Sequence, residues 1–112
     1  MTKYHIDKDK VGEFWRNHSA KFQLNENSGL SNLEMDEELG QLKLKEERRV
    51  INQYFKNLNG CMLDLGAGSG EWSFFLAKQF SKVIAVEKTE GMIEAFNKKL
   101  VSSKSKNIEL IE

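Results

Sequence analysis

The chain of 112 residues contains no proline, and Cys61 is its only cysteine. One cysteine excludes an internal disulfide and any cysteine-based metal cluster, and we expect Cys61 to be a buried, inert thiol. Uninterrupted apolar runs stop at four residues, as at residues 83–86, far below the roughly 20 that cross a bilayer. The N-terminus is polar, unlike a secretory signal. These absences predict a globular protein with one small domain and no membrane partner, for which a reducing cytoplasm is the simplest location.

The chain also lacks an excess of charge of either sign, since 17 acidic residues balance 17 basic ones. A protein that binds nucleic acid through its phosphates shows a basic excess on some segment. Only residues 98–106, with four lysines, are locally basic, and a solvated helix end and loop explains them. Neither His5 nor His18 has an acid or cysteine at ligand spacing. Composition therefore gives no strong nucleic-acid signal and predicts no metal site.

Residues 1–58 have the apolar periodicity of helices and are predicted to form a helical N-terminal cap. A capping-box pattern at residues 31–34 predicts the start of a second helix, which Gly40 loosens, and residues 46–58 predict a third. The first helix, of about 13 residues, is predicted from one apolar stripe that contains Val11, Phe14, Trp15, His18 and Phe22.

Residues 59–112 change to an alternation of short β-branched runs and helical stretches. Such alternation is typical of βαβ units around a parallel sheet, so the predicted fold class is α/β. The predicted strands cover residues 61–65, 82–87 and 108–111, and the predicted helices cover residues 71–80 and 89–101.

A glycine-rich segment, residues 66–70, lies between the first predicted strand and the next helix. Three alternating glycines let the backbone turn sharply and let a ligand lie against it without a Cβ in the way. The amides that open the following helix point toward such a ligand. By itself this segment indicates only a nucleotide-like ligand.

Two acids narrow the choice of ligand. Glu87 ends the second predicted strand, 21 positions after Gly66, where a carboxylate can accept hydrogen bonds from both ribose hydroxyls of an adenosine. Asp64 precedes the loop, where it would repel a pyrophosphate and suit a cationic ligand. The third glycine of a dinucleotide fingerprint would fall at Glu71, which disfavours an NAD-dependent oxidoreductase. The alternatives are a structural acid at Asp64, bonded to loop amides, and a solvated strand end at Glu87.

Residues 63–70 resemble the first motif of class I S-adenosylmethionine-dependent methyltransferases, in which an acid and an apolar residue precede G-x-G-x-G. Residues 86–92 are similar to the second motif of that family, with Met92 five positions after the acid. The resemblance covers about residues 58–112 and implies a Rossmann-like parallel sheet that binds S-adenosylmethionine. Residues 14–22 are loosely similar to the N-terminal helix of members that act on small molecules.

The resemblance also implies a role for each matching residue. The loop would contact the methionine part of the cofactor, Asp64 would lie near its amino group, and Glu87 would hold the ribose. Lys88 and Met92 would flank the adenine, and Trp15 would help to close the pocket. The residues that the family places at the cofactor are therefore Trp15, Asp64, Gly66, Ala67, Gly68, Gly70, Glu87, Lys88 and Met92.

The sequence departs from the family at its end, because the seven-stranded family fold continues beyond the third strand, where Glu112 closes this sequence. We therefore expect a Rossmann-like sheet truncated after about three strands, which holds the cofactor-binding half, and no catalytic residue can be named. A small molecule is the expected methyl acceptor, and the isolated chain is expected to be inactive. Without a fourth strand, residues 61–65 would form an open sheet edge that favours a homodimer. The alternative function is a non-catalytic nucleotide-fold fragment that self-associates or binds a partner.

Overall fold

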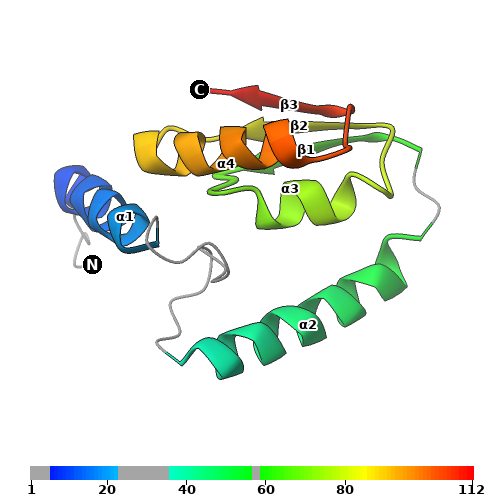
Figure 1. Ribbon diagram of the computed structural model, residues 1–112, viewed down its shortest axis with the longest axis horizontal. Coiled ribbons are helices and arrows are strands. Elements are labelled where there is room, and N and C mark those ends of the chain that lie inside the picture. The colour runs from blue at the N-terminus through cyan, green and yellow to red at the C-terminus, as the bar shows by residue number, and fades with distance from the viewer. Residues whose placement is uncertain (1–5, 23–35, 57–58) are drawn as a thin grey trace, which may run out of the picture.

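The computed structural model describes residues 6–22, 36–56 and 59–112. Its strands form a three-stranded parallel sheet in the order β1-β2-β3, with helices between successive strands (Figure 1). The predicted α/β class is thereby confirmed. In chain order the elements are α1 (Lys8–Phe22), α2 (Glu37–Tyr54), β1 (Cys61–Leu65), α3 (Glu71–Leu76), β2 (Lys82–Val86), α4 (Glu90–Ser102) and β3 (Ile108–Ile111).

Helices α3 and α4 cover one face of the sheet (Figure 1). Side chains of a strand point alternately to opposite faces, and the register places Met62 beside Val83 on the covered face. Val83 and Ala85 of the central strand are fully buried there, as is Phe96 of α4. The core of the described residues therefore lies between this face and the two helices.

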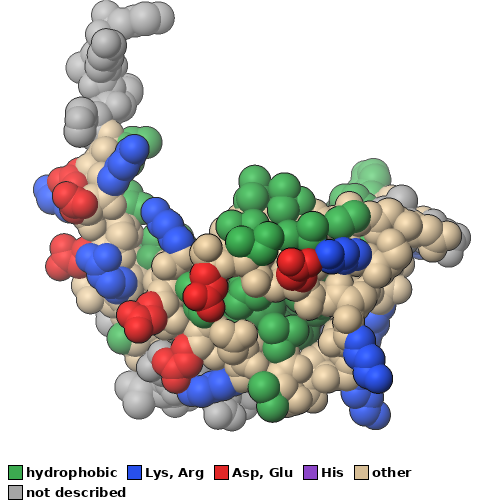
Figure 2. Space-filling view, turned by 90° about the horizontal axis from the view of Figure 1, so that it is seen from above, with side chains coloured by type: hydrophobic (Ala, Val, Ile, Leu, Met, Phe, Trp, Pro, Cys, Tyr) green, Lys and Arg blue, Asp and Glu red, His purple; other side chains and the backbone are tan. Residues whose placement is uncertain are grey.

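The opposite face of the sheet carries no described helix. Leu63 and Leu65 of β1 and Ile111 of β3 are exposed on it, and Leu65 retains 72% of its surface. Figure 2 views the sheet from this side and shows hydrophobic side chains gathered over the strands. The expectation of a buried thiol at Cys61 is wrong, because Cys61 shares this open face with Leu63 and is exposed.

The N-terminal helices begin at aspartates that accept hydrogen bonds from the first amides. Asp7 accepts from two amides of α1, and Asp36 accepts from the amide of Leu39 in α2. Helix α2 is one continuous helix where two were predicted, since Gly40 keeps its helical bond to the carbonyl of Asp36 at 2.9 Å. The predicted capping box at residues 31–34 lies outside the described residues.

Two helices end earlier than the sequence pattern predicts, and in both cases distant residues are involved. Helix α2 stops at Tyr54, and the ring of Phe55 then packs 6.1 Å from that of Phe80. Helix α3 stops at Leu76 because the side-chain amide of Asn107 donates to the carbonyls of Ala77 and Phe80, at 2.8 and 2.9 Å. Local periodicity cannot reveal such a contact across about thirty positions.

The N-terminal helices lie at two sides of the sheet layer. Helix α1 packs against α4 and lies beyond the carboxyl ends of the strands, whereas α2 lies along α3 (Figure 1). The carboxyl ends of β1 and β2 thus face α1.

Among the described residues, no helix is long and apolar enough to cross a membrane.

Replacing Phe96 by alanine should lower the free energy of unfolding by about 3 kcal/mol, because it empties a fully buried ring site. Urea unfolding followed by circular dichroism measures the change. The matched control is Val101→Ala in the same helix, where the side chain is 89% exposed and the change should stay within about 0.5 kcal/mol. Equal losses in the two variants would contradict this placement of the core.

Candidate functional site

The glycine-rich loop, residues 66–70, leaves β1 at its carboxyl end and is attached at once to the neighbouring strand. The amides of Gly66 and Ala67 both donate to the carbonyl of Val86, at 2.8 and 3.0 Å. Gly66, Gly68 and Gly70 all have positive φ angles, of 72°, 58° and 89°. The loop therefore follows a left-handed path that L side chains rarely adopt.

Gly70 is also required by packing. A Cβ at this position would lie 2.6 Å from the ring of Phe74 and 2.8 Å from the ring of Phe96. These two rings pack with their centroids 5.0 Å apart, so neither can move away freely. The core thus contacts the backbone at the point where the loop becomes α3.

Glu87 follows β2 directly and holds the other side of the loop. Its carboxylate is 9% exposed and accepts three backbone hydrogen bonds, each of 2.8 Å. Oε2 accepts from Gly68 of the loop, whereas Oε1 accepts from Lys88 and Thr89 of the turn before α4. Since a carboxylate oxygen has two lone pairs, one acceptor position remains on Oε2.

Asp64 points from β1 toward α3, where its Oδ2 accepts a hydrogen bond of 2.6 Å from the hydroxyl of Ser73. Ser73 is fully buried, so this bond fixes the carboxylate beside the loop. One interpretation of Asp64 from the sequence was an acid bonded to loop amides. Among the described residues Glu87 has that arrangement, and Asp64 is bonded to a hydroxyl.

The structure brings most of the predicted site residues together at this loop. Met92 of α4 is buried, and its sulfur lies 4.0 Å from the position of a Cβ on Gly68. Lys88 is exposed beside Glu87. Trp15 lies apart on α1, half-buried, with its ring 5.2 Å from that of Phe14 and 5.6 Å from that of His18.

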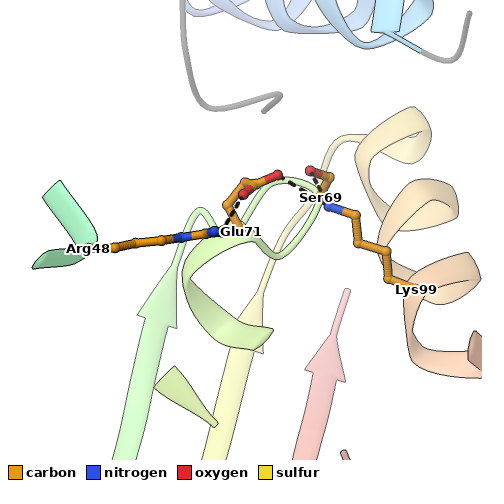
Figure 3. Close-up of polar contacts among 4 residues, drawn as sticks. All are labelled: Arg48, Ser69, Glu71 and Lys99. Atoms are coloured by element: carbon orange, nitrogen blue, oxygen red, sulfur yellow. Dashed lines mark hydrogen bonds and ion pairs between the residues drawn. The ribbon is translucent and has the colours of Figure 1, made fainter. Parts of the chain in front are cut away.

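A second group of polar side chains at the loop was not predicted. We refer to Arg48, Ser69, Glu71 and Lys99 as the Glu71 cluster (Figure 3). The carboxylate of Glu71 contacts the guanidinium of Arg48 at 3.0 Å and the amine of Lys99 at 3.5 Å. Lys99 also donates to the hydroxyl of Ser69 at 3.3 Å. Lys99, which the sequence predicted to be a solvated lysine of the basic segment, thus has two polar partners, although 39% of its side chain remains exposed.

A cavity of about 610 Å³ lies between α2 and the beginning of α3. Its walls are mainly apolar, and the half-buried indole of Trp72 forms part of them. The residues that line it are Lys43, Glu46, Glu47, Val50, Ile51 and Trp72. In the described part of the chain, no group of histidine, cysteine or acidic residues could hold a metal ion.

The glycine-rich loop, the two carboxylates and the parallel strands can be compared with those of known proteins. A family model described as methyltransferase domain matches residues 62–112. The matched residues include the glycine-rich loop and both carboxylates, and over them the chain is similar to a methyltransferase domain. The resemblance predicted from the two motifs is thereby confirmed, although no curated protein matches the sequence.

Solved structures share the fold. Phosphoethanolamine N-methyltransferase 1 of Haemonchus contortus, in complex with phosphoethanolamine and S-adenosylhomocysteine, matches with a TM-score of 0.67 at 18% identity, over 98% of this chain and 23% of that one. DhpI in complex with SAM and HEP matches with a TM-score of 0.65 at 15% identity, over 99% of this chain and 44% of that one. The glycopeptide N-methyltransferase MtfA, complexed with S-adenosyl-L-methionine, gives 0.50 at 27% identity, over 59% of this chain and 30% of that one. The chain thus spans less than half of each relative, and the likeness confirms the predicted Rossmann-like fold.

Gly70→Ala should destabilise the α/β domain, because the added Cβ meets two aromatic rings and the φ of 89° is unfavourable for alanine. We expect a loss of about 2 kcal/mol or more in the free energy of unfolding, as is typical of overpacking combined with backbone strain. Gly60→Ala is the control, since a Cβ there meets nothing within 4 Å. Chemical denaturation of both variants gives the comparison. A Gly70 variant as stable as the Gly60 variant would contradict the described loop.

Proposed function

We propose that the chain is the S-adenosylmethionine-binding part of a methyltransferase that acts on a small molecule. In this proposal residues 59–112 bind the cofactor and residues 1–58 form a helical cap. The observation that carries it is the loop with three left-handed glycines, held by Glu87 in a domain similar to a methyltransferase domain. S-adenosylmethionine supplies a sulfonium-activated methyl group, and the protein aligns the acceptor with it.

The proposed contacts use the groups that the fold places at the loop. The backbone from Gly66 to Gly70, including Ala67, would lie along the methionine part of the cofactor, and Asp64 would face its ammonium group. The remaining acceptor position on Glu87 Oε2 would take a ribose hydroxyl without breaking the bond to Gly68.

The adenine would lie between the stem of Lys88 and Met92, and Trp15 would close the pocket from α1. Helix α1 supports this last contact, since it lies beyond the carboxyl ends of the strands (Figure 1). The catalytic residue, if the reaction needs one, stays unassigned.

A small-molecule acceptor is supported by the balanced charge of the chain and by two of its structural relatives. The phosphoethanolamine N-methyltransferase was solved with its small substrate, and MtfA is a glycopeptide N-methyltransferase. A cytoplasmic location is proposed on the single free cysteine alone.

Glu87→Ala should weaken binding of S-adenosylhomocysteine at least tenfold, measured by calorimetry on the full chain. Hydrogen bonds to charged groups contribute about 1.5–3 kcal/mol each, so loss of one ribose contact is sufficient for this effect. Glu90→Ala, which removes an exposed acid three positions along the chain, should leave the affinity within about twofold.

Because Glu87 also holds the loop, its proposed contact with the ribose must be tested separately, with altered ligands. Wild type should bind the 2′-deoxy or the 3′-deoxy analogue of S-adenosylhomocysteine more weakly than the parent, whereas the Glu87→Ala variant should bind all three alike. A variant that still discriminates among the three ligands would show that the ribose is bound elsewhere.

The alternative function, self-association without catalysis, is favoured by one observation, the open side of β1. In the described part of the chain β1 pairs with β2 alone, and Leu63 and Leu65 expose apolar surface beside the free edge. We propose that two copies pair through this edge and cover these leucines, since exposed apolar strand edges recruit further strands.

Light scattering on the wild-type chain should then report a dimer. Leu65→Lys should raise the dissociation constant of this dimer at least tenfold, because the interface would bury an unpaired charge. Val101→Lys, at a site on α4 that is also exposed, should leave the dimer intact. A wild-type chain that stays monomeric at high micromolar concentration would contradict the homodimer and leave the cofactor proposal untouched.

A further inference from the structure

Helix α2 docks on α3 and the turn that follows it through one line of residues, Arg48, Asn52 and Phe55, spaced as neighbours on one helical face. The side-chain oxygen of Asn52 accepts from Gln79 at 3.3 Å, and the ring of Phe55 contacts that of Phe80. Arg48 forms the end of this line that lies nearest to the glycine loop.

Arg48 makes two contacts with α3. Its guanidinium lies 4.9 Å from the ring centroid of Phe75 and bonds to the carboxylate of Glu71 one turn earlier. Its Nε is buried and has no hydrogen-bond partner among the described residues. The guanidinium therefore depends on Glu71 for its compensating charge.

Glu71 connects this contact to the loop, because it is the residue directly after Gly70. Its side chain is only 15% exposed and lies between a cation of α2 and a cation of α4 (Figure 3). Lys99 of α4 also bonds to Ser69, directly before Gly70. Two helices that are far apart in the sequence thus hold the residues on both sides of one glycine.

The loop is consequently fixed at two points, by Glu87 at Gly68 and by the Glu71 cluster at Ser69 and Glu71. A ligand that lies along the loop needs both points in place, since a mobile loop must lose conformational entropy when it binds. Loss of either cation leaves the other paired, but loss of the Glu71 charge leaves two cations close together.

We propose that Glu71 and Arg48 are positioning residues for the cofactor: the ion pair between them transmits the docking of α2 to the glycine loop and fixes the loop in its binding geometry. Neither side chain touches the cofactor in this proposal, which rests on the proposed function. The N-terminal helix α2 thereby becomes part of the cofactor site without contributing a direct contact.

The test compares Arg48→Met with Arg49→Met on the full chain. Both arginines lie on α2 and both pair with a glutamate, but Arg49 pairs with Glu46 of its own helix at the surface. Methionine keeps an unbranched apolar chain and removes the charge, together with the guanidinium contact to Phe75. Arg48→Met should speed hydrogen exchange of the amides at residues 66–70 and weaken S-adenosylhomocysteine binding about five- to tenfold. Arg49→Met should change neither by more than about twofold.

Two further variants separate positioning from loss of folding. Arg48→Lys keeps the charge and should recover more than half of the lost binding free energy and the slow exchange at residues 66–70. Glu71→Gln should weaken binding by itself, and should cost less in the Arg48→Met background, because the two changes remove one shared interaction.

Equal effects of Arg48→Met and Arg49→Met on both readouts would overturn the proposal, as would additive effects of Arg48→Met and Glu71→Gln. If wild type binds no S-adenosylhomocysteine, the proposed function fails and hydrogen exchange alone decides the inference. In that case unchanged exchange at residues 66–70 in Arg48→Met overturns it, and faster exchange there with Arg49→Met unchanged supports the loop contact.

Discussion

The carboxylate of Glu87 connects the parts of this site that lie in different segments of the chain. Through three backbone amides it joins the glycine loop after β1 to the turn that starts α4. Gly68 lies beyond the end of β1, so its amide has no partner in the strand ladder and needs another acceptor. A buried carboxylate at the end of the neighbouring strand meets that need. This contact thereby links the position of the loop to the start of α4, and Met92 of that helix is buried beside Gly68.

Sequence pattern was sufficient wherever the structure is decided locally. The strands at residues 61–65 and 108–111 have the predicted bounds, since β-branched and apolar runs flanked by turn residues define them. The glycine-rich loop and the two acids, Asp64 and Glu87, could be recognised from the sequence, because residue type and spacing along the chain are enough to identify them. Pattern was not sufficient where distant residues decide the outcome. The side chain of Asn107 ends α3, and the exposure of Cys61 depends on which face of β1 the helices cover.

The Glu71 cluster shows the same limit at the site itself. In the sequence Glu71 was informative only as the residue that replaces a third glycine, and Lys99 was one of several lysines in a basic segment. Their partners lie 23 and 28 positions away, so that only the packing of α2 and α4 around α3 brings the charges together. An acid at the first position of a helix is the one local signal, since it interacts favourably with the helix N-terminus. The burial that makes this acid need a charged partner is visible only in the structure.

The distribution of charge around the loop separates two kinds of group. On one side Arg48 and Lys99 share the carboxylate of Glu71, so these two cations are already paired. On the other side Asp64 and Glu87 accept hydrogen bonds from hydroxyl and amide donors in the described residues, which leave their charge uncompensated. Two carboxylates with uncharged donors, close to a loop of small residues, produce a negative potential there. A phosphate-bearing dinucleotide would be repelled by that potential, whereas a ligand that carries an ammonium and a sulfonium would be attracted, which supports a cofactor of the latter kind.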